Sequence, residues 1–297
     1  MIHTKLPIGL LLGVLTALIL GCTPSSASTA QPSQAVASAT TTPAANPTPS
    51  ARPTVSSLPR LADTFDIGGG RSLYLECTGA GSPTILLEAG DTDTGADHWR
   101  RVYPSLIRAT RTCFYDRAGL GRSSAATGCR ELDDINDDLD ALLAAAKIDG
   151  PFILVGASGG GFLQAGFAAR HPDQVAGMVF VETPKALTAA LYPEILPDLK
   201  CDAPGNVERR DYLKVEHAAW DHKKKLGDFP LIVMSNDYGP SGERDDKNNV
   251  ADQQGWFVLS PDHAEQVVVT SGHGIASNEP QLVVAQILKV LAAARTA

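Results

Sequence analysis

The chain has 297 residues and a formal net charge of −8, with 25 Lys and Arg against 33 Asp and Glu. An acidic chain lacks the basic surface that nucleic-acid binding requires, so we expect no nucleic-acid partner. No apolar run of 18 residues follows residue 30, so the body of the chain is not expected to span a membrane. The length fits one large α/β domain or two small ones.

The first 21 residues read as an export signal. Lys5 precedes an apolar stretch, Ile8–Leu20, which as a helix is too short to cross a hydrocarbon core of about 30 Å. The stretch ends in Ile19-Leu20-Gly21-Cys22, which resembles the bacterial lipoprotein box. The resemblance implies cleavage before Cys22, lipidation of that cysteine and an outward-facing anchor in the cell membrane. The alternative is an ordinary secretory signal, and both interpretations predict export.

The segment from Cys22 to Arg60 is rich in Ala, Ser, Thr and Pro and has almost nothing to bury. Such a composition does not offset the entropy cost of ordering, so we expect a disordered tether before a folded domain over residues 61–297.

Four cysteines follow Cys22 in the chain. They are Cys77, Cys113, Cys129 and Cys201. In an oxidising compartment they can form two disulfides, with three possible pairings. Cysteine and histidine do not occur here at the spacing of a zinc site, so no metal is expected, and no organic cofactor is implied.

The folded part alternates short apolar runs with amphipathic segments. We expect strands at residues 64–67, 71–77, 84–88, 111–115, 152–155, 175–181, 231–234 and 267–269. Helices are expected at residues 133–146, from about 161 onward, and at 281–294. Strands that alternate with helices predict a mostly parallel sheet covered on both faces. Ligands bind such sheets at the carboxyl ends of the strands, so the chemistry should lie just after the strands.

Ser158 lies where such chemistry is expected. The strand Phe152–Val155 leads into Gly156-Ala157-Ser158-Gly159-Gly160, and a helix follows. This is G-x-S-x-G in the strand–turn–helix context of a nucleophile elbow, where small neighbours allow a tight turn that exposes the serine hydroxyl. Ser158 is therefore the predicted nucleophile.

A serine nucleophile needs a base, and His273 is the candidate. It follows the last predicted strand in Ser271-Gly272-His273-Gly274-Ile275, at the same sheet edge as Ser158. The other histidines lie in polar, charged or helix-end surroundings, or in the signal.

With these motifs, the chain from Leu61 onward resembles an α/β-hydrolase-fold serine hydrolase of the esterase and lipase type. Besides the elbow, the matching segments are Leu87-Glu88-Ala89-Gly90, Tyr115–Ser123, Ala169-Arg170-His171-Pro172, Gly272-His273-Gly274-Ile275 and Glu279-Pro280. The resemblance implies an eight-stranded sheet and a small cap between strands six and seven, at about residues 183–228. Asp116 is taken as a structural residue of its loop.

The resemblance also implies an oxyanion hole made of the backbone N–H groups of Asp91 and Gly159. The family sheet places the second strand beside the fourth, which implies the disulfides Cys77–Cys113 and Cys129–Cys201. The charged stretch that begins at Arg209 in the cap is interpreted as a solvated surface.

The acid of the predicted triad is either Glu182 or Asp237. Most relatives carry it after the seventh strand, which points to Asp237, whereas a minority carry it after the sixth, which points to Glu182. A carboxylate at the end of an apolar buried strand is costly unless it is paired, for example with a histidine, and this favours Glu182 slightly.

The sequence therefore predicts an exported, lipid-anchored and monomeric serine hydrolase that cleaves a small ester. An aminopeptidase or amidase of the same fold and a catalytically silent binding module are the alternatives.

Overall fold

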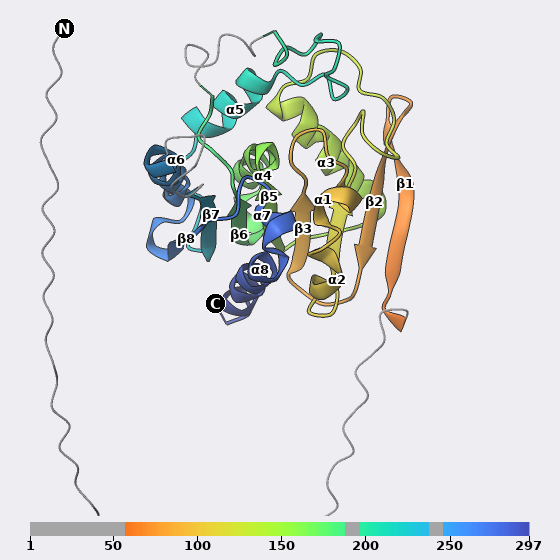
Figure 1. Ribbon diagram of the computed structural model, residues 1–297. Coiled ribbons are helices and arrows are strands. Elements are labelled where there is room, and N and C mark those ends of the chain that lie inside the picture. Colours follow the sequence, from red (N-terminus) through yellow and green to blue (C-terminus); the bar gives the residue numbers. More distant parts are fainter. Residues whose placement is uncertain (1–56, 188–196, 238–245, 297) are drawn as a thin grey trace, which may run out of the picture. The chain divides into compact units, whose positions relative to one another are not determined.

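The computed structural model describes residues 57–187, 197–237 and 246–296 (Figure 1). The predicted signal with Cys22, and the tether up to residue 56, lie outside the described residues.

The described residues form the predicted eight-stranded, mostly parallel sheet. Its strands are β1 (Arg60–Gly68), β2 (Arg71–Thr78), β3 (Thr84–Glu88), β4 (Thr112–Tyr115), β5 (Phe152–Ala157), β6 (Val175–Val181), β7 (Leu231–Asn236) and β8 (Ala264–Val269). They lie in the order β1-β2-β4-β3-β5-β6-β7-β8. β2 is antiparallel to both of its neighbours, β1 and β4. In the rest of the sheet, from β4 through β3, β5, β6 and β7 to β8, every neighbouring pair is parallel. The carboxyl ends of β3, β5, β6, β7 and β8 therefore meet at one edge.

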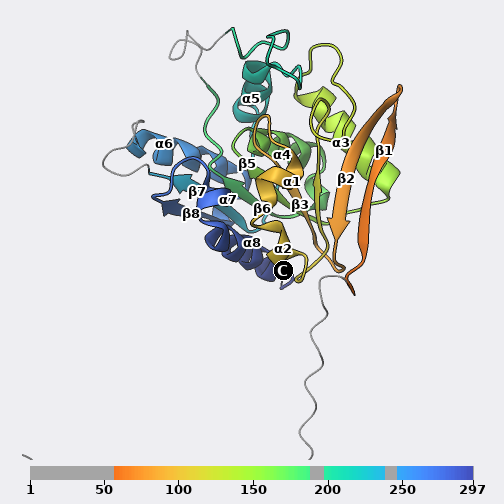
Figure 2. The same cartoon turned by 45° about the vertical axis from the view of Figure 1, so that its right-hand side comes forward.

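Helices cover both faces of this sheet (Figures 1 and 2). The helices are α1 (Gly95–Trp99), α2 (Tyr103–Leu106), α3 (Leu132–Ala146), α4 (Gly159–Arg170), α5 (Tyr212–Asp221), α6 (Asp246–Gln253), α7 (Ile275–Asn278) and α8 (Pro280–Ala294). One core layer contains the apolar faces of α3, α4 and α5, and the other contains those of α1, α2, α7 and α8.

The strand sequences explain how these two layers form. Side chains alternate across a strand, so Ile85 and Leu87 of β3 face the α8 layer while Leu86 faces the α4 layer. All five residues of β3 are buried, as expected for a central parallel strand with helices on both sides.

Two disulfides fasten the fold, with the pairing that the resemblance implies. Cys77 of β2 lies opposite Cys113 of β4 in the antiparallel register and is bonded to it. Cys129, which precedes α3, is bonded to Cys201, in the chain segment before α5.

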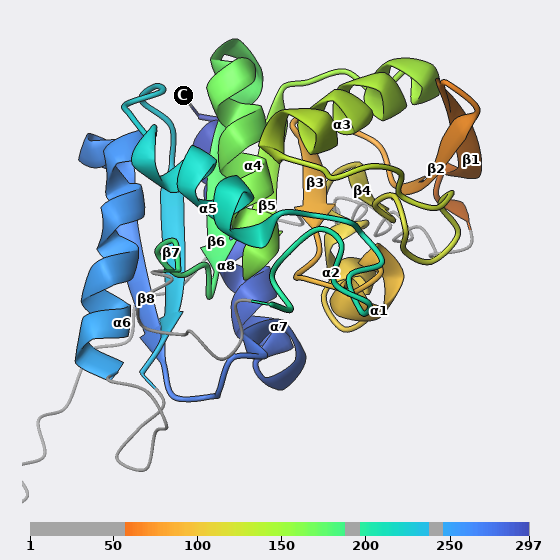
Figure 3. The ribbon, with the colours of Figure 1, turned by 90° about the horizontal axis from the view of Figure 1, so that it is seen from above.

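Helix α5, which comes between β6 and β7 in the chain, lies on the side of the sheet at which the parallel strands end (Figure 1). Seen from above, α5 crosses α4 (Figure 3), and its Val215 and Ala219 belong to the same core layer as α4. The interpretation of the charged stretch as a solvated surface is wrong in part, because Arg210 is 1% exposed and Glu216 is 6% exposed. Both charged groups are enclosed where α5 and the preceding loop pack onto the rest of the domain.

No helix within the described ranges is long and apolar enough to cross a membrane.

Candidate active site

Ser158 lies at the tip of the turn between β5 and α4. Its backbone angles are φ 47° and ψ −126°, which are strained for a residue with a side chain. A hydrogen bond from its N–H to the Val181 carbonyl, 2.9 Å long, holds the turn against β6. The turn also requires Gly156, because a Cβ there would lie 2.6 Å from the Gly161 Cα. The glycines of the motif thus permit a turn that raises the Ser158 hydroxyl above the sheet.

His273 follows β8 and faces this serine. The distance from its Nε2 to the Ser158 Oγ is 2.9 Å. The loop that carries it is fixed by Asn236 at the end of β7, whose Oδ1 accepts hydrogen bonds from the N–H groups of Ser271 and Gly272, at 2.8 and 2.9 Å. The structure therefore brings the predicted nucleophile and base into hydrogen-bond contact.

Glu182 lies behind the histidine. It directly follows β6, is 2% exposed, and has a positive φ of 53°. Its Oε1 lies 3.9 Å from the Nδ1 of His273, and its Oε2 accepts a 2.6 Å hydrogen bond from the Asn236 N–H. The carboxylate is thus aimed at the ring nitrogen that does not contact Ser158.

Asp237 lies one residue beyond β7 and makes other contacts. Its Oδ1 accepts a 2.6 Å hydrogen bond from the Thr270 hydroxyl, and its N–H donates to the Val269 carbonyl. Both contacts tie it to the end of β8. Of the two acids that the sequence left open, Glu182 is the one with an ion-pair contact to His273.

The two predicted oxyanion donors lie next to the serine. A Cβ placed on Gly90 would lie 3.6 Å from the Ser158 Cβ, so the chain that enters Asp91 passes beside the nucleophile. The side chain of Asp91 lies against Gly159, where any Cβ would collide with its carboxylate. Gly159 is also the first residue of α4, so its N–H belongs to the positive end of a helix.

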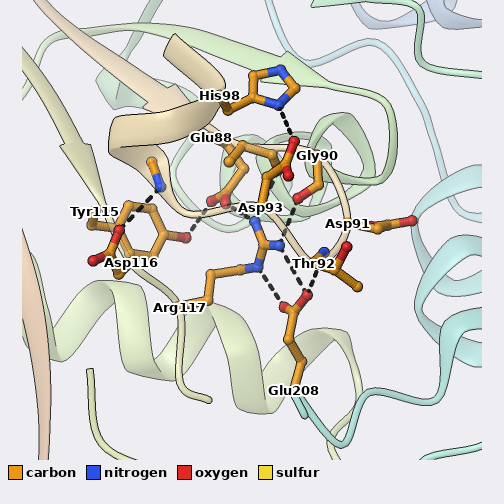
Figure 4. A network of polar contacts seen from close by, with 12 residues as sticks. Glu88, Gly90, Asp91, Thr92, Asp93, His98, Tyr115, Asp116, Arg117 and Glu208 are labelled. Atoms are coloured by element: carbon orange, nitrogen blue, oxygen red, sulfur yellow. Dashed lines mark hydrogen bonds and ion pairs between the residues drawn. The ribbon is translucent and has the colours of Figure 1, made fainter. Parts of the chain in front are cut away.

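A buried network of charged groups holds the loop that carries Asp91 (Figure 4). Arg117 donates to Glu88 and to Glu208, in each case at 2.6 Å, and to the carbonyls of Ala89 and Gly90 at 2.8 Å. Glu208 also accepts a 3.0 Å hydrogen bond from the Thr92 N–H. The backbone on both sides of Asp91 is therefore anchored.

Within this network, groups of opposite charge lie next to one another. Burial raises the pKa of a carboxyl group, but Arg117 and Arg210 outweigh burial at Glu208 and lower its pKa to about 2. Burial raises the pKa of Glu88, and Arg117 opposes that shift. Arg210 extends the network toward the serine by an ion pair with Asp91.

His98 of α1 is a second histidine beside the serine, which the sequence patterns did not single out. Its Nδ1 lies 2.9 Å from the Asp93 Oδ2, and a Cβ on Gly90 would lie 3.3 Å from its Cε1. Burial lowers its pKa, and Asp93 opposes that shift. Its position depends on how α1 packs, which no local motif indicates.

Asp116 has the structural position expected for it. It is 1% exposed and accepts hydrogen bonds from the N–H groups of Gly95 and Arg122, at 3.0 and 3.1 Å. It thereby joins the loop after β4 to the start of α1.

Within the described part of the chain, no group of three or more His, Cys, Asp or Glu side chains is arranged to hold a metal ion.

Comparisons with known proteins agree with this architecture. A family model described as the alpha/beta hydrolase fold matches residues 83–211. The chain is 28% identical over 231 residues to the uncharacterized protein YqjL of Bacillus subtilis (strain 168), covering 73% of this chain and 86% of that protein. It is 30% identical over 138 residues to 2-hydroxy-6-oxo-6-(2'-aminophenyl)hexa-2,4-dienoic acid hydrolase of Metapseudomonas resinovorans, covering 45% of this chain and 44% of that enzyme.

The structure of a thermophilic esterase from Thermogutta terrifontis matches with a TM-score of 0.60, over 80% of this chain and 99% of that chain. The sequence identity is only 18%, so this likeness is one of fold. With the strand order described above, it confirms the prediction that the chain has the α/β-hydrolase fold.

Proposed function

We propose that the protein is a serine hydrolase that cleaves carboxylic esters through an acyl-enzyme intermediate. The observation that carries this proposal is the 2.9 Å contact between the Ser158 Oγ and the His273 Nε2. A serine hydroxyl is a weak nucleophile until a neighbouring base removes its proton, and this contact supplies such a base.

In the proposed reaction, the Ser158 oxygen attacks the ester carbonyl while the His273 Nε2 takes the hydroxyl proton. The imidazolium then gives this proton to the leaving alcohol, and an acyl group remains on the serine. A water molecule then attacks the acyl group while His273 takes its proton. His273 returns this proton to Ser158, and the acid is released. Glu182 orients the imidazole and stabilises its positive charge, which its buried position near Nδ1 supports.

The N–H groups of Asp91 and Gly159 stabilise the tetrahedral oxyanion in this proposal. Fixed donors of this kind contribute about 3 kcal/mol each to transition-state stabilisation. Arg117 and Glu208 support the first donor indirectly, because they anchor the carbonyl of Gly90 and the N–H of Thr92.

The test is hydrolysis of 4-nitrophenyl acetate and butyrate by the full-length protein. We expect turnover by the wild type and a loss of about 10³-fold or more in Ser158→Ala and His273→Ala. His263→Ala is the matched control, because His263 lies in the short turn before β8 and should leave turnover unchanged. A folded wild type without turnover would favour the silent binding module instead.

The N-terminal residues support a second part of the proposal, that the protein is exported and anchored through a lipid on Cys22. We expect an alkyne-labelled fatty acid to be incorporated into the wild type and not into Cys22→Ala. Release of an unlabelled wild type into the medium would instead support an ordinary secretory signal.

A further inference from the structure

Arg210 is a buried guanidinium with unused donors. Only 1% of its side chain is exposed, and its Nη2 is paired with the Asp91 carboxylate. Among the described residues, its Nε and Nη1 have no hydrogen-bond partner. The ring of Tyr212 lies 4.2 Å below the guanidinium carbon and covers one face of the group. Enclosed N–H groups without partners are costly, so this is a site at which an acceptor would be favourable.

The Asp91 carboxylate places Arg210 next to the reaction centre. It contacts Arg210 and at the same time lies against Gly159, the residue after Ser158. Its side chain points away from Arg117, although both belong to the same network (Figure 4). In this arrangement a negative charge stands beside the N–H groups at which a tetrahedral oxyanion would form. Such a charge opposes the reaction for as long as it stays there.

The two partners of this ion pair differ in burial. Arg210 is 1% exposed and is fixed between Tyr212 and the network, whereas the Asp91 side chain is 34% exposed. The backbone of the Asp91 loop is anchored on both sides, at Gly90 and Thr92. The Asp91 side chain can therefore turn outward while its N–H keeps its place.

The chemistry of Arg210 favours a carboxylate as the replacement, because a guanidinium pairs with a carboxylate through charge-assisted hydrogen bonds. Without Asp91, the buried groups Glu88, Arg117, Glu208 and Arg210 carry two charges of each sign. A substrate carboxylate in the place of the Asp91 carboxylate would keep the present set of two positive and three negative charges. It would also meet a cation in a water-poor site, where charge-assisted hydrogen bonds are strong.

We propose that Arg210 binds a carboxylate carried by the substrate, which displaces the carboxylate of Asp91 and leaves the oxyanion hole free. The substrate class is then a half-ester of a short dicarboxylic acid. The inference rests on the proposed hydrolase function and deepens it. Arg210 both selects the substrate and, when it binds the substrate carboxylate, releases the Asp91 carboxylate from the oxyanion hole.

The first experiment compares kcat/KM of the full-length protein for monomethyl glutarate and methyl pentanoate, which differ in a terminal carboxylate. We expect a preference for monomethyl glutarate of about tenfold or more in the wild type, the size of a charge-assisted hydrogen bond. The preference should fall to near one in Arg210→Gln and persist in part in Arg210→Lys. Equal kcat/KM values in the wild type, or an unchanged ratio in Arg210→Gln, would overturn the proposal.

The second experiment separates this inference from the proposed function. Glutarate binding is measured by calorimetry on the wild type, Arg210→Gln and Asp91→Ala, which needs no catalysis. We expect binding by the wild type, none by Arg210→Gln, and tighter binding by Asp91→Ala because the internal competitor is gone. Absence of glutarate binding to both the wild type and Asp91→Ala would refute the carboxylate site. Absence of ester turnover with intact binding would refute the hydrolase function alone.

Discussion

At the scale of single residues, His273 faces a carboxylate that directly follows β6, that of Glu182. Glu182 is held by the Asn236 N–H through one oxygen and faces the imidazole with the other. The side chain of Asn236 also fixes the loop before His273, so one residue contacts both Glu182 and the loop that carries His273.

This arrangement predicts that Glu182→Gln lowers kcat by about 10³- to 10⁴-fold, because a neutral amide does not stabilise the imidazolium. Asp237→Asn is the matched comparison and should change kcat by less than about threefold. Steady-state kinetics on a 4-nitrophenyl ester measure both variants. A larger loss of kcat in Asp237→Asn than in Glu182→Gln would assign the acid to Asp237.

The sequence was sufficient to predict that Ser158 and His273 lie at the same edge of the sheet, because each lies in a local motif next to a recognisable strand. It did not decide between Glu182 and Asp237, since that choice depends on how the ends of β6, β7 and β8 meet in space. Arg210 was hidden for a similar reason. In sequence it belongs to a charged stretch, and only its packing against the Asp91 loop shows that it is enclosed.

At the scale of elements, the predicted strands follow from apolar runs, and the main differences lie at the two edges. β1 begins at Arg60 rather than at residue 64. β8 begins at Ala264 rather than at residue 267, and it includes Glu265 and Gln266. A strand at the edge of a sheet exposes one side, so polar residues extend it without a burial cost. Alternation of apolar residues therefore underestimates the length of such a strand.

Helix α5 carries an unusual carboxyl group. Glu216 accepts a 2.8 Å hydrogen bond from the Leu187 N–H, but burial is the larger effect and raises its pKa to about 7. As pH rises, the folded protein thus keeps a proton that the unfolded chain, with a glutamate pKa of about 4.3, already releases at lower pH. The stabilisation from this proton is complete below about pH 4.3 and is lost as pH rises through 7.

We therefore predict that Glu216→Gln makes the free energy of unfolding less dependent on pH between 5 and 8. We compare the free energy of unfolding of the variant with that of the wild type. This difference should shift in favour of the variant by up to about 3 kcal/mol between pH 4 to 5 and pH 8. Urea unfolding at several pH values measures this. A pH dependence that is the same in both proteins would show that Glu216 does not titrate in this range.

At the scale of the whole molecule, the fold brings together residues that lie far apart in the chain. Ser158, Glu182 and His273 follow three different strands and converge because parallel strands end at one edge of the sheet. The fold class was predictable from the alternation of elements and the motifs between them. The contacts of Arg210 and Glu216 with the rest of the domain were not predictable, because both residues are charged in sequence and are buried only by packing.

The most direct test of the central claim is labelling of the full-length protein with a fluorophosphonate, followed by peptide mapping. The account predicts one added phosphonyl group on Ser158, formed rapidly in the wild type, slowly in His273→Ala and not at all in Ser158→Ala. Labelling on another residue, or no labelling of a folded wild type, would contradict the claim that Ser158 and His273 form a working nucleophile and base.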